Sequence, residues 1–207
     1  MLIYRYDEDM FNSNAMALVN TINCMGVMGV GVAKKFKQKY PEMFMDYVKK
    51  CTAKEVTIGK LYLYPISSDR LIINFPTKYH WRYRSRIKYI EAGLKDFINH
   101  YKDWKITSIA FPQLGCGNGG LKWSEVKPLM EKYLGNLDID VEIYVDQKRE
   151  YSRELTEKVK MLNSQQIKKL LDMANNFLEG KKDVLERDTQ KKLTSFNEIN
   201  LRDKINE

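Results

Sequence analysis

Cysteine is scarce in this sequence, and long apolar runs are missing from it. The three cysteines, Cys24, Cys51 and Cys116, lie far apart without a Cys-x-x-Cys pair, which argues against a disulfide framework and a structural zinc site. Acidic residues stand near the N-terminus, where a signal peptide has its apolar core. No run approaches the roughly 20 apolar residues of a membrane-spanning helix. These absences predict a cytoplasmic protein with no membrane partner, no metal site and no cofactor.

Negative charge is outweighed by positive charge. The net charge is +8 over 207 residues, and residues 1–150 carry most of the excess. A positive field attracts anions such as phosphate-bearing ligands or nucleic acid, although the same excess is compatible with a merely solubilising surface. The length suits one domain with its own hydrophobic core, followed by an appendage.

Short strand-like apolar runs alternate with segments of helical periodicity up to about residue 146. The predicted strands are Leu2–Tyr6, Ala17–Ile22, Leu61–Tyr64, Leu71–Phe75, Ile106–Phe111 and Val141–Val145. The predicted helices are Val32–Tyr40, Pro41–Cys51, Ser85–Tyr101 and Ser124–Leu134. Pro41 is suited to the first turn of its helix, and Ser85 is placed to cap the next one. This alternation predicts an α/β fold in three α/β/α layers.

The composition changes after Asp146. Residues 147–207 contain no tryptophan, no proline and a single glycine, and they are heavily charged. An apolar stripe from Ile167 to Leu178 predicts one amphipathic helix of about 15 residues. Beyond Gly180 the apolar anchors are sparse, which favours marginal or partner-dependent structure. We therefore expect a domain over residues 1–146 and a charged helical tail over 147–207.

Two glycine-rich loops each connect a predicted strand to a predicted helix. The first follows Asn20 and Asn23 and contains Gly29-Val30-Gly31, and the second is Gln113–Leu121. Glycine lets backbone N–H groups approach a ligand, and a following helix N-terminus favours anions. Neither loop has a Walker motif or a complete dinucleotide fingerprint. Each loop alone can be a tight connection, but two at the carboxyl ends of strands in one sheet can clamp a diphosphate from both sides.

Three ordered motifs give the sequence a specific resemblance. They are Val-Asn-Thr-Ile-Asn-Cys-Met-Gly-Val-Met-Gly-Val-Gly-Val-Ala (19–33), Ile-Asn-Phe-Pro-Thr-Lys-Tyr-His-Trp (73–81) and Pro-Gln-Leu-Gly-Cys-Gly-Asn-Gly-Gly-Leu-Lys-Trp (112–123). Residues 1–146 closely resemble macrodomains of the DarG antitoxin family, near the terminal ADP-ribose glycohydrolases. The resemblance implies a macrodomain with a central mixed sheet. It also implies a hydrolase that removes ADP-ribose from thymine bases of single-stranded DNA, as antitoxin to a DarT-like toxin, and the tail may be what binds that toxin.

The resemblance also assigns roles in binding ADP-ribose. Asp9 would accept a hydrogen bond from the adenine amino group, and the two loops would wrap the diphosphate and the distal ribose. Asn20 and Asn23 would reach ribose hydroxyls or support the first loop, while the residues alone also allow simple turn formers. The ADP-ribose-binding residues expected in this way are Asp9, Met10, Asn20, Asn23, Gly29, Val30, Gly31, Val32, Gly115, Cys116, Gly117, Asn118, Gly119, Gly120 and Leu121.

Lys78 is the expected catalytic residue because the resembling family carries its essential lysine at this strand end. Desolvation or neighbouring arginines can lower the pKa of a lysine and activate it. In the animal terminal ADP-ribose glycohydrolase, an aspartate resolves the adduct between the lysine and ADP-ribose. Gly119 stands at the position of that aspartate here. The complete covalent mechanism of that enzyme therefore cannot be assumed for this chain. Lys78 can instead stabilise the departing base or the charge on the ribose. His80 is a candidate proton relay, and Asn23 a supporting group.

Aromatic and basic residues interleave directly after Lys78. Tyr79, Trp81, Arg82 and Arg84 form the expected DNA-binding stretch, because aromatic faces stack on unpaired bases while cations follow the backbone. The alternative is that the aromatic rings pack into the fold. Two other functions keep both loops without needing this stretch. One is hydrolysis of ADP-ribosylated protein acids or O-acetyl-ADP-ribose, and the other is non-catalytic reading of ADP-ribose.

Overall fold

The structure is a computed structural model, described here over residues 1–179. The chain divides into two compact units, Met1–Glu150 and Tyr151–Glu207. The division falls a few residues beyond the domain end expected from composition, so that residues 147–150 lie with the first unit.

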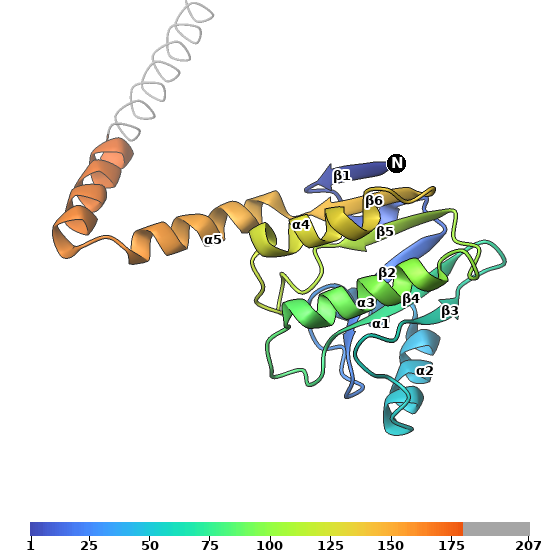
Figure 1. The fold of residues 1–207 in the computed structure, drawn as a ribbon. Helices are drawn as coiled ribbons and strands as arrows, with labels where there is room; N and C mark the ends of the chain where they lie inside the picture. The colour runs from blue at the N-terminus through green and yellow to red at the C-terminus, as the bar shows by residue number, and fades with distance from the viewer. Residues whose placement is uncertain (180–207) are drawn as a thin grey trace, which may run out of the picture. The chain divides into compact units, whose positions relative to one another are not determined.

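The first unit is built on one six-stranded mixed sheet (Figure 1). Its strands are β1 (Leu2–Tyr6), β2 (Ala17–Asn23), β3 (Tyr62–Pro65), β4 (Leu71–Lys78), β5 (Ser108–Pro112) and β6 (Asp140–Val145). The order is β1-β6-β5-β2-β4-β3, and only β3 runs antiparallel to its neighbour. The central strands β2, β4 and β5 are almost continuously buried, as expected for parallel strands covered on both faces. The predicted mixed sheet is confirmed.

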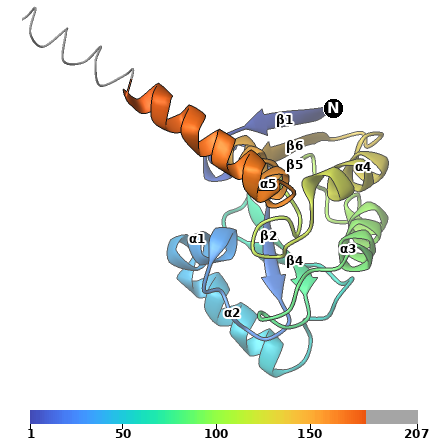
Figure 2. The same ribbon diagram turned by 90° about the vertical axis from the view of Figure 1, so that its left-hand side faces the viewer.

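Helices cover both faces of this sheet. The first unit contains η1 (Met10–Asn12), α1 (Gly31–Lys39), α2 (Pro41–Thr52), α3 (Ile87–His100) and α4 (Trp123–Leu134), and α5 (Gln147–Lys160) begins at its end. In Figure 2, α1 and α2 lie on one side of the strands and α3 and α4 on the other. Two separate apolar clusters fill the two spaces between sheet and helices. The three-layer α/β/α prediction is therefore confirmed.

The two expected helix starts have different outcomes. Pro41 opens α2 as predicted. Ser85 does not cap α3, because that helix begins at Ile87 with Arg86 at the N-cap position and no side-chain cap. Ser85 is instead buried beneath the second glycine loop, where its N–H donates to the carbonyl oxygen of Gly119 at 2.9 Å. The capping prediction was wrong because this serine supports the loop rather than the helix.

In the second unit the described residues are helical. The later part of α5 is followed by a helix over 164–179, which confirms the helix predicted from the stripe Ile167–Leu178, although α5 itself was not predicted. The sparse anchors expected beyond Gly180 lie outside the described residues. Within residues 1–179, no helix is long and apolar enough to cross a membrane.

Candidate functional site

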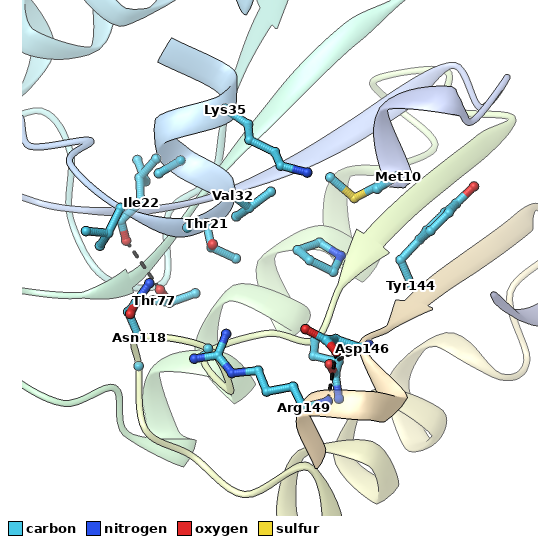
Figure 3. Close-up of a pocket in the computed structure, with 18 of the residues that line it drawn as sticks. Met10, Thr21, Ile22, Val32, Lys35, Thr77, Asn118, Tyr144, Asp146 and Arg149 are labelled. Carbon is cyan, nitrogen blue, oxygen red and sulfur yellow. Dashed lines mark hydrogen bonds between the residues drawn. The ribbon is translucent and has the colours of Figure 1, made fainter. Parts of the chain in front are cut away.

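A cleft of about 860 Å³ opens at the carboxyl ends of the parallel strands. Residues from both glycine loops line it, together with η1 and the ends of β2, β4, β5 and β6. Figure 3 shows Met10, Val32, Asn118 and Tyr144 around this space, each coming from a different segment. In open α/β sheets the loops at carboxyl strand ends diverge and leave such a crevice. The two loops singled out in the sequence therefore meet at one site.

Asn23 organises the first loop. Its Oδ1 accepts from the N–H of Met25 at 2.9 Å and from the Tyr47 hydroxyl at 3.1 Å, while its Nδ2 donates to the carbonyl oxygen of Val27 at 2.6 Å. The side chain lines the cleft but is 7% exposed. Both ends of the amide are thus engaged in holding the loop, which favours the supporting role over a direct contact with a ligand.

Asn20 does not reach the cleft. It is completely buried in β2, and its Nδ2 donates to Asn74 Oδ1 on the neighbouring strand β4 at 2.9 Å. The same nitrogen lies 3.9 Å from the sulfur of Met28, within the first loop. The expected contact with a ribose hydroxyl is therefore wrong, and Asn20 instead stabilises the strand pair beneath that loop.

The end of the first loop presents free backbone donors to the cleft. Helix α1 starts at Gly31 without a side-chain cap or an acidic residue in its first turn, so the N–H groups of that turn are available to an anion. Gly31 has a φ of +62°, and a Cβ there would stand 2.8 Å from Asn118 Nδ2. The absence of a side chain at Gly31 therefore lets the two glycine loops approach each other.

The second loop is closed by its own backbone. Gly120 N–H donates to the carbonyl oxygen of Gly117, and Leu121 N–H to that of Gly115. For the intervening N–H groups of residues 117–119, no acceptor is found among residues 1–179. Successive unpaired backbone N–H groups form a concave site for anions. This geometry supports the predicted diphosphate clamp.

Gly119 cannot be replaced by a larger residue without moving the loop. A Cβ at this position would lie 2.1 Å from the carbonyl oxygen of Gly115 and 2.4 Å from Ser85 Oγ. The loop conformation therefore has no room for an aspartate at residue 119, which agrees with the expectation that a covalent mechanism does not transfer whole.

Three residues assigned to the second loop do not line the cleft, namely Cys116, Gly120 and Leu121. Cys116 is buried and its thiol faces the carbonyl oxygen of Leu114, while Leu121 packs against the side of Gly115. Gly120 has a φ of +80° and lies against the guanidinium of Arg84. These residues shape the loop, so the direct contacts expected from them are corrected to structural ones.

Lys78 is the last residue of β4, and it faces the cleft. Its Nζ donates to the backbone carbonyl oxygen of Asn118 at 2.5 Å, which ties β4 to the second loop. Desolvation lowers the pKa of Lys78, and no neighbouring cation contributes. Of the two causes considered from the sequence, burial is therefore the one present. The carbonyl contact directs this amine toward the space above the second loop.

Asp9 holds the N-terminus of η1 at the other end of the cleft. Its Oδ1 accepts from the N–H of Phe11 at 3.1 Å, and its Oδ2 pairs with Lys35 Nζ at 3.2 Å. The backbone bond and the lysine hold the pKa of this carboxyl below its usual value. Asp9 and the buried Met10 both line the cleft, so a charged acceptor remains close to the predicted adenine position.

The basic aromatic segment after Lys78 lies on the surface. Tyr79, Trp81 and Tyr83 are 61%, 45% and 66% exposed, which contradicts the alternative that these rings pack into the fold. Trp81 also lines the cleft, and the guanidinium of Arg82 lies 4.7 Å from the centre of its ring. An exposed aromatic and cationic surface therefore begins at the cleft.

His80 is not placed as a proton relay. Its ring lies between those of Trp81 and Tyr83, at centroid distances of 5.5 and 5.0 Å, and its Nδ1 accepts from the N–H of Arg82. It does not line the cleft. Its position supports a structural role within the aromatic segment, in place of the expected catalytic one.

Sequence reasoning missed the wall formed by the end of β6 and the first turn of α5. Asp146 Oδ1 accepts from the N–H of Arg149 at 2.9 Å, and Asp7 Oδ1 from that of Gln147 at 2.9 Å. Asp146 and Arg149 line the cleft and are labelled in Figure 3. An aspartate that directly follows a strand is an N-cap signal, but here the change in composition suggested that the domain had already ended.

A half-buried carboxylate links the missed wall to η1. Glu142 accepts from Ser13 Oγ at 2.6 Å, from the Tyr144 hydroxyl at 3.0 Å and from Arg5 Nη2 at 3.0 Å. Burial acts to raise the pKa of Glu142, but these hydrogen bonds outweigh it and lower the pKa. Glu142 therefore fixes the ring of Tyr144, which lines the cleft, relative to the segment that carries Asp9.

Comparison with known proteins identifies the family of this chain. A model of the Macro domain matches residues 19–130, from the middle of β2 into α4. The chain belongs to the macrodomain family. Its fold and the paired glycine loops are those expected from the resemblance in the sequence.

Several relatives carry informative names. A Mycobacterium tuberculosis protein named DNA ADP-ribosyl glycohydrolase is 47% identical over 140 residues, which cover 66% of this chain and 40% of that protein. A Thermosipho africanus DNA ADP-ribosyl transferase-DNA ADP-ribosyl glycohydrolase fusion protein is 39% identical over 157 residues, covering 67% of this chain and 40% of that one. The solved structure of Thermosipho africanus DarTG in complex with ADP-ribose superposes with a TM-score of 0.67 at 40% identity, covering 70% of this chain and 42% of that one. This macrodomain chain thus spans about 40% of the length of these curated relatives.

Proposed function

We propose that this chain is a DNA ADP-ribosyl glycohydrolase that cleaves the bond between ADP-ribose and thymine bases of single-stranded DNA. The observation that carries the proposal is the position of Lys78, a lysine of lowered pKa at the meeting point of β4 and an anion-binding glycine loop. The names of its relatives support the same reaction. We further propose that it acts in the cytoplasm as antitoxin to a DarT-like DNA ADP-ribosyltransferase.

The cleft can hold ADP-ribose in one direction. The adenine would lie near Asp9, whose carboxylate is an acceptor for the exocyclic amino group. The diphosphate would lie between the first turn of α1 and residues 117–119, where backbone N–H groups are free of protein acceptors in the described part of the chain. The distal ribose would then reach Lys78. This orientation places the bond to be broken beside the exposed aromatic segment.

The chemistry proposed for Lys78 is charge stabilisation at the scissile bond. When water replaces the base at the anomeric carbon, the departing thymine takes the electron pair of the C–N bond and a negative charge develops on it. An ammonium group in a partly dehydrated site stabilises that charge and can deliver the proton to the base, and the proton released by the attacking water then restores the ammonium. The absence of space for an aspartate at residue 119 leaves no carboxylate there to resolve a lysine adduct.

The exposed segment fits the DNA part of the substrate. Tyr79, Trp81, Arg82 and Arg84 follow Lys78 directly, so a strand attached through its modified base would leave the cleft across them. Stacking on exposed rings is worth about 1–3 kcal/mol per base and tolerates any sequence. We therefore propose that this segment binds unpaired bases beside the modified one.

A substrate panel tests the proposal against the other two functions. ADP-ribosylated single-stranded DNA, ADP-ribosylated protein and O-acetyl-ADP-ribose would each be incubated with the wild type and with Lys78→Ala. Release of ADP-ribose from the DNA alone, lost in the variant, supports a DNA glycohydrolase. Preference for the protein or the acetyl ester would indicate the other hydrolase, and binding without any release would indicate a reader.

The proposed toxin contact lies in the second unit. Ile167, Leu170, Leu171, Phe177 and Leu178 are all exposed on the helix over 164–179. An exposed apolar stripe of this kind is typical of helices that bind a partner. We propose that the region from Tyr151 onward binds the DarT-like toxin, while the catalytic unit is the chain up to Glu150.

A further inference from the structure

Arg149 is a cation of the cleft to which the proposed function gives no role. It stands in the first turn of α5, and its side chain extends toward Asn118 in Figure 3. If Gly117 carried a Cβ, that atom would lie 3.3 Å from Arg149 Nη1. The guanidinium therefore lies directly over the second glycine loop.

The position of Arg149 is held by bonds on both sides of α5. The N–H of Asp146 donates to Gln113 Oε1 at 3.0 Å, which joins the start of this helix to the first residue of the second loop. The N–H of Gln147 donates to Asp7 Oδ1, which joins it to the segment before η1. The first turn of α5 is thus bonded to both walls of the cleft. These bonds fix the backbone from which the side chain of Arg149 extends.

Charge pairing separates Arg149 from Lys35 and Lys78, which also line the cleft. Lys35 is paired with Asp9, and Lys78 donates to the carbonyl oxygen of Asn118. Within residues 1–179, no carboxylate pairs with the guanidinium of Arg149. Next to it, residues 117–119 offer N–H groups that have no acceptor among residues 1–179. An unpaired guanidinium next to unpaired amides is suited to bind a phosphate group.

We propose that Arg149 binds the diphosphate of the ligand from beside the second glycine loop. This inference rests on the proposed binding of ADP-ribose and adds a residue from α5 to it. The planar guanidinium can donate two parallel hydrogen bonds to phosphate oxygens. The loop amides and Arg149 would donate to the diphosphate together, so the catalytic unit includes the start of α5.

Affinity measurements on Arg149→Ala test this proposal, with ADP-ribose measured by calorimetry and adenosine by NMR titration. A charge-assisted hydrogen bond contributes enough that we expect ADP-ribose to bind at least about tenfold more weakly. Adenosine has no phosphate, so its affinity should stay unchanged. Arg149→Lys should fall between the wild type and Arg149→Ala for ADP-ribose, since it keeps the charge without the planar fork.

Lys102→Ala is the matched control. Lys102 pairs with Asp138 at 3.2 Å. These residues precede β5 and β6, so the pair lies at the amino ends of the strands, away from the cleft at their carboxyl ends. The Lys102→Ala substitution removes one positive charge without altering the cleft, so this variant should bind ADP-ribose like the wild type. If Arg149→Ala binds ADP-ribose as tightly as this control, or loses adenosine to the same extent, the diphosphate contact is refuted while the proposed function stands. A wild type that fails to bind ADP-ribose would overturn both.

Discussion

Replacing Lys78 by alanine should separate catalysis from binding. Lys78 donates to the carbonyl oxygen of Asn118 and is proposed to act at the scissile bond, whereas the proposed diphosphate site consists of backbone amides and Arg149. Removing one preorganised group that stabilises charge in the transition state typically costs about 10²–10³ in rate. We expect a loss of this size in the single-turnover release of ADP-ribose from DNA, with the affinity for ADP-ribose changed by only a few-fold.

The dependence on pH distinguishes the two possible roles of Lys78. Desolvation lowers the pKa of this group, so its proton is lost below the usual lysine range of about 10.4. If the ammonium stabilises the departing base, the rate should fall as pH rises through the lowered pKa. If the free amine attacked the anomeric carbon, the rate would instead rise over the same window. A rising profile, or an active Lys78→Ala variant, would refute the role proposed here.

As pH rises through the lowered pKa of Lys78, protein stability should increase while activity decreases. Since the folded chain holds this proton less tightly than the unfolded chain, the charged lysine opposes folding at neutral pH. That cost is relieved as pH rises from the lowered pKa toward the ordinary value. Removing the side chain removes both the cost and the hydrogen bond to Asn118, so thermal unfolding of Lys78→Ala should shift little. A large drop in unfolding temperature would show that its loss of activity is a folding defect.

The remaining predictions concern the loops, the boundary and the DNA. Gly117→Glu should abolish ADP-ribose binding in calorimetry at an unchanged unfolding temperature, because its carboxylate would repel the diphosphate and pair with Arg149; intact binding would remove the loop from the site. Gly119→Ala should lower the unfolding temperature itself, since its Cβ meets a backbone oxygen at 2.1 Å, and a stable variant would contradict the loop geometry. A chain ending at Glu150 should retain full hydrolysis of modified DNA but lose toxin binding in pull-down, and an inactive, folded chain would move the boundary. Trp81→Ala should weaken binding of single-stranded DNA by about tenfold in fluorescence anisotropy while leaving ADP-ribose affinity unchanged, and equal DNA binding would exclude this ring from the interface.

The layers of the fold were predictable because their signals are local. Short apolar runs rich in β-branched residues and helices with one apolar face follow from the chain alone. Most predicted elements agree with the structure to within a few residues at each end. The positions of the glycine loops were predictable for the same reason, since each lies between one strand and the next helix.

The errors in the site all depended on contacts between distant residues. The resemblance assigned Asn20 to the ribose hydroxyls or to support of the first loop, but its amide is bonded to Asn74 on another strand. Ser85 was assigned to a helix cap, but it packs against Gly119. Arg149 was missed because the charged segment after β6 has the composition of a tail, while the bonds from Asp7 and Gln113 that hold it in place lie far away in the chain.

The crowding around Gly119 connects the shape of the second loop to the chemistry of the cleft. The carbonyl oxygen of Gly115 and the hydroxyl of Ser85 occupy the space that a side chain at residue 119 would need. The tight curvature of this loop leaves its amides unpaired and able to bind a diphosphate. The same curvature leaves no space at residue 119 for a carboxylate beside Lys78. Without that carboxylate there is neither a partner to neutralise the lysine nor a base at that position to hydrolyse an adduct. A lysine in these surroundings is better suited to stabilise the negative charge of the departing base than to form a covalent bond with the sugar.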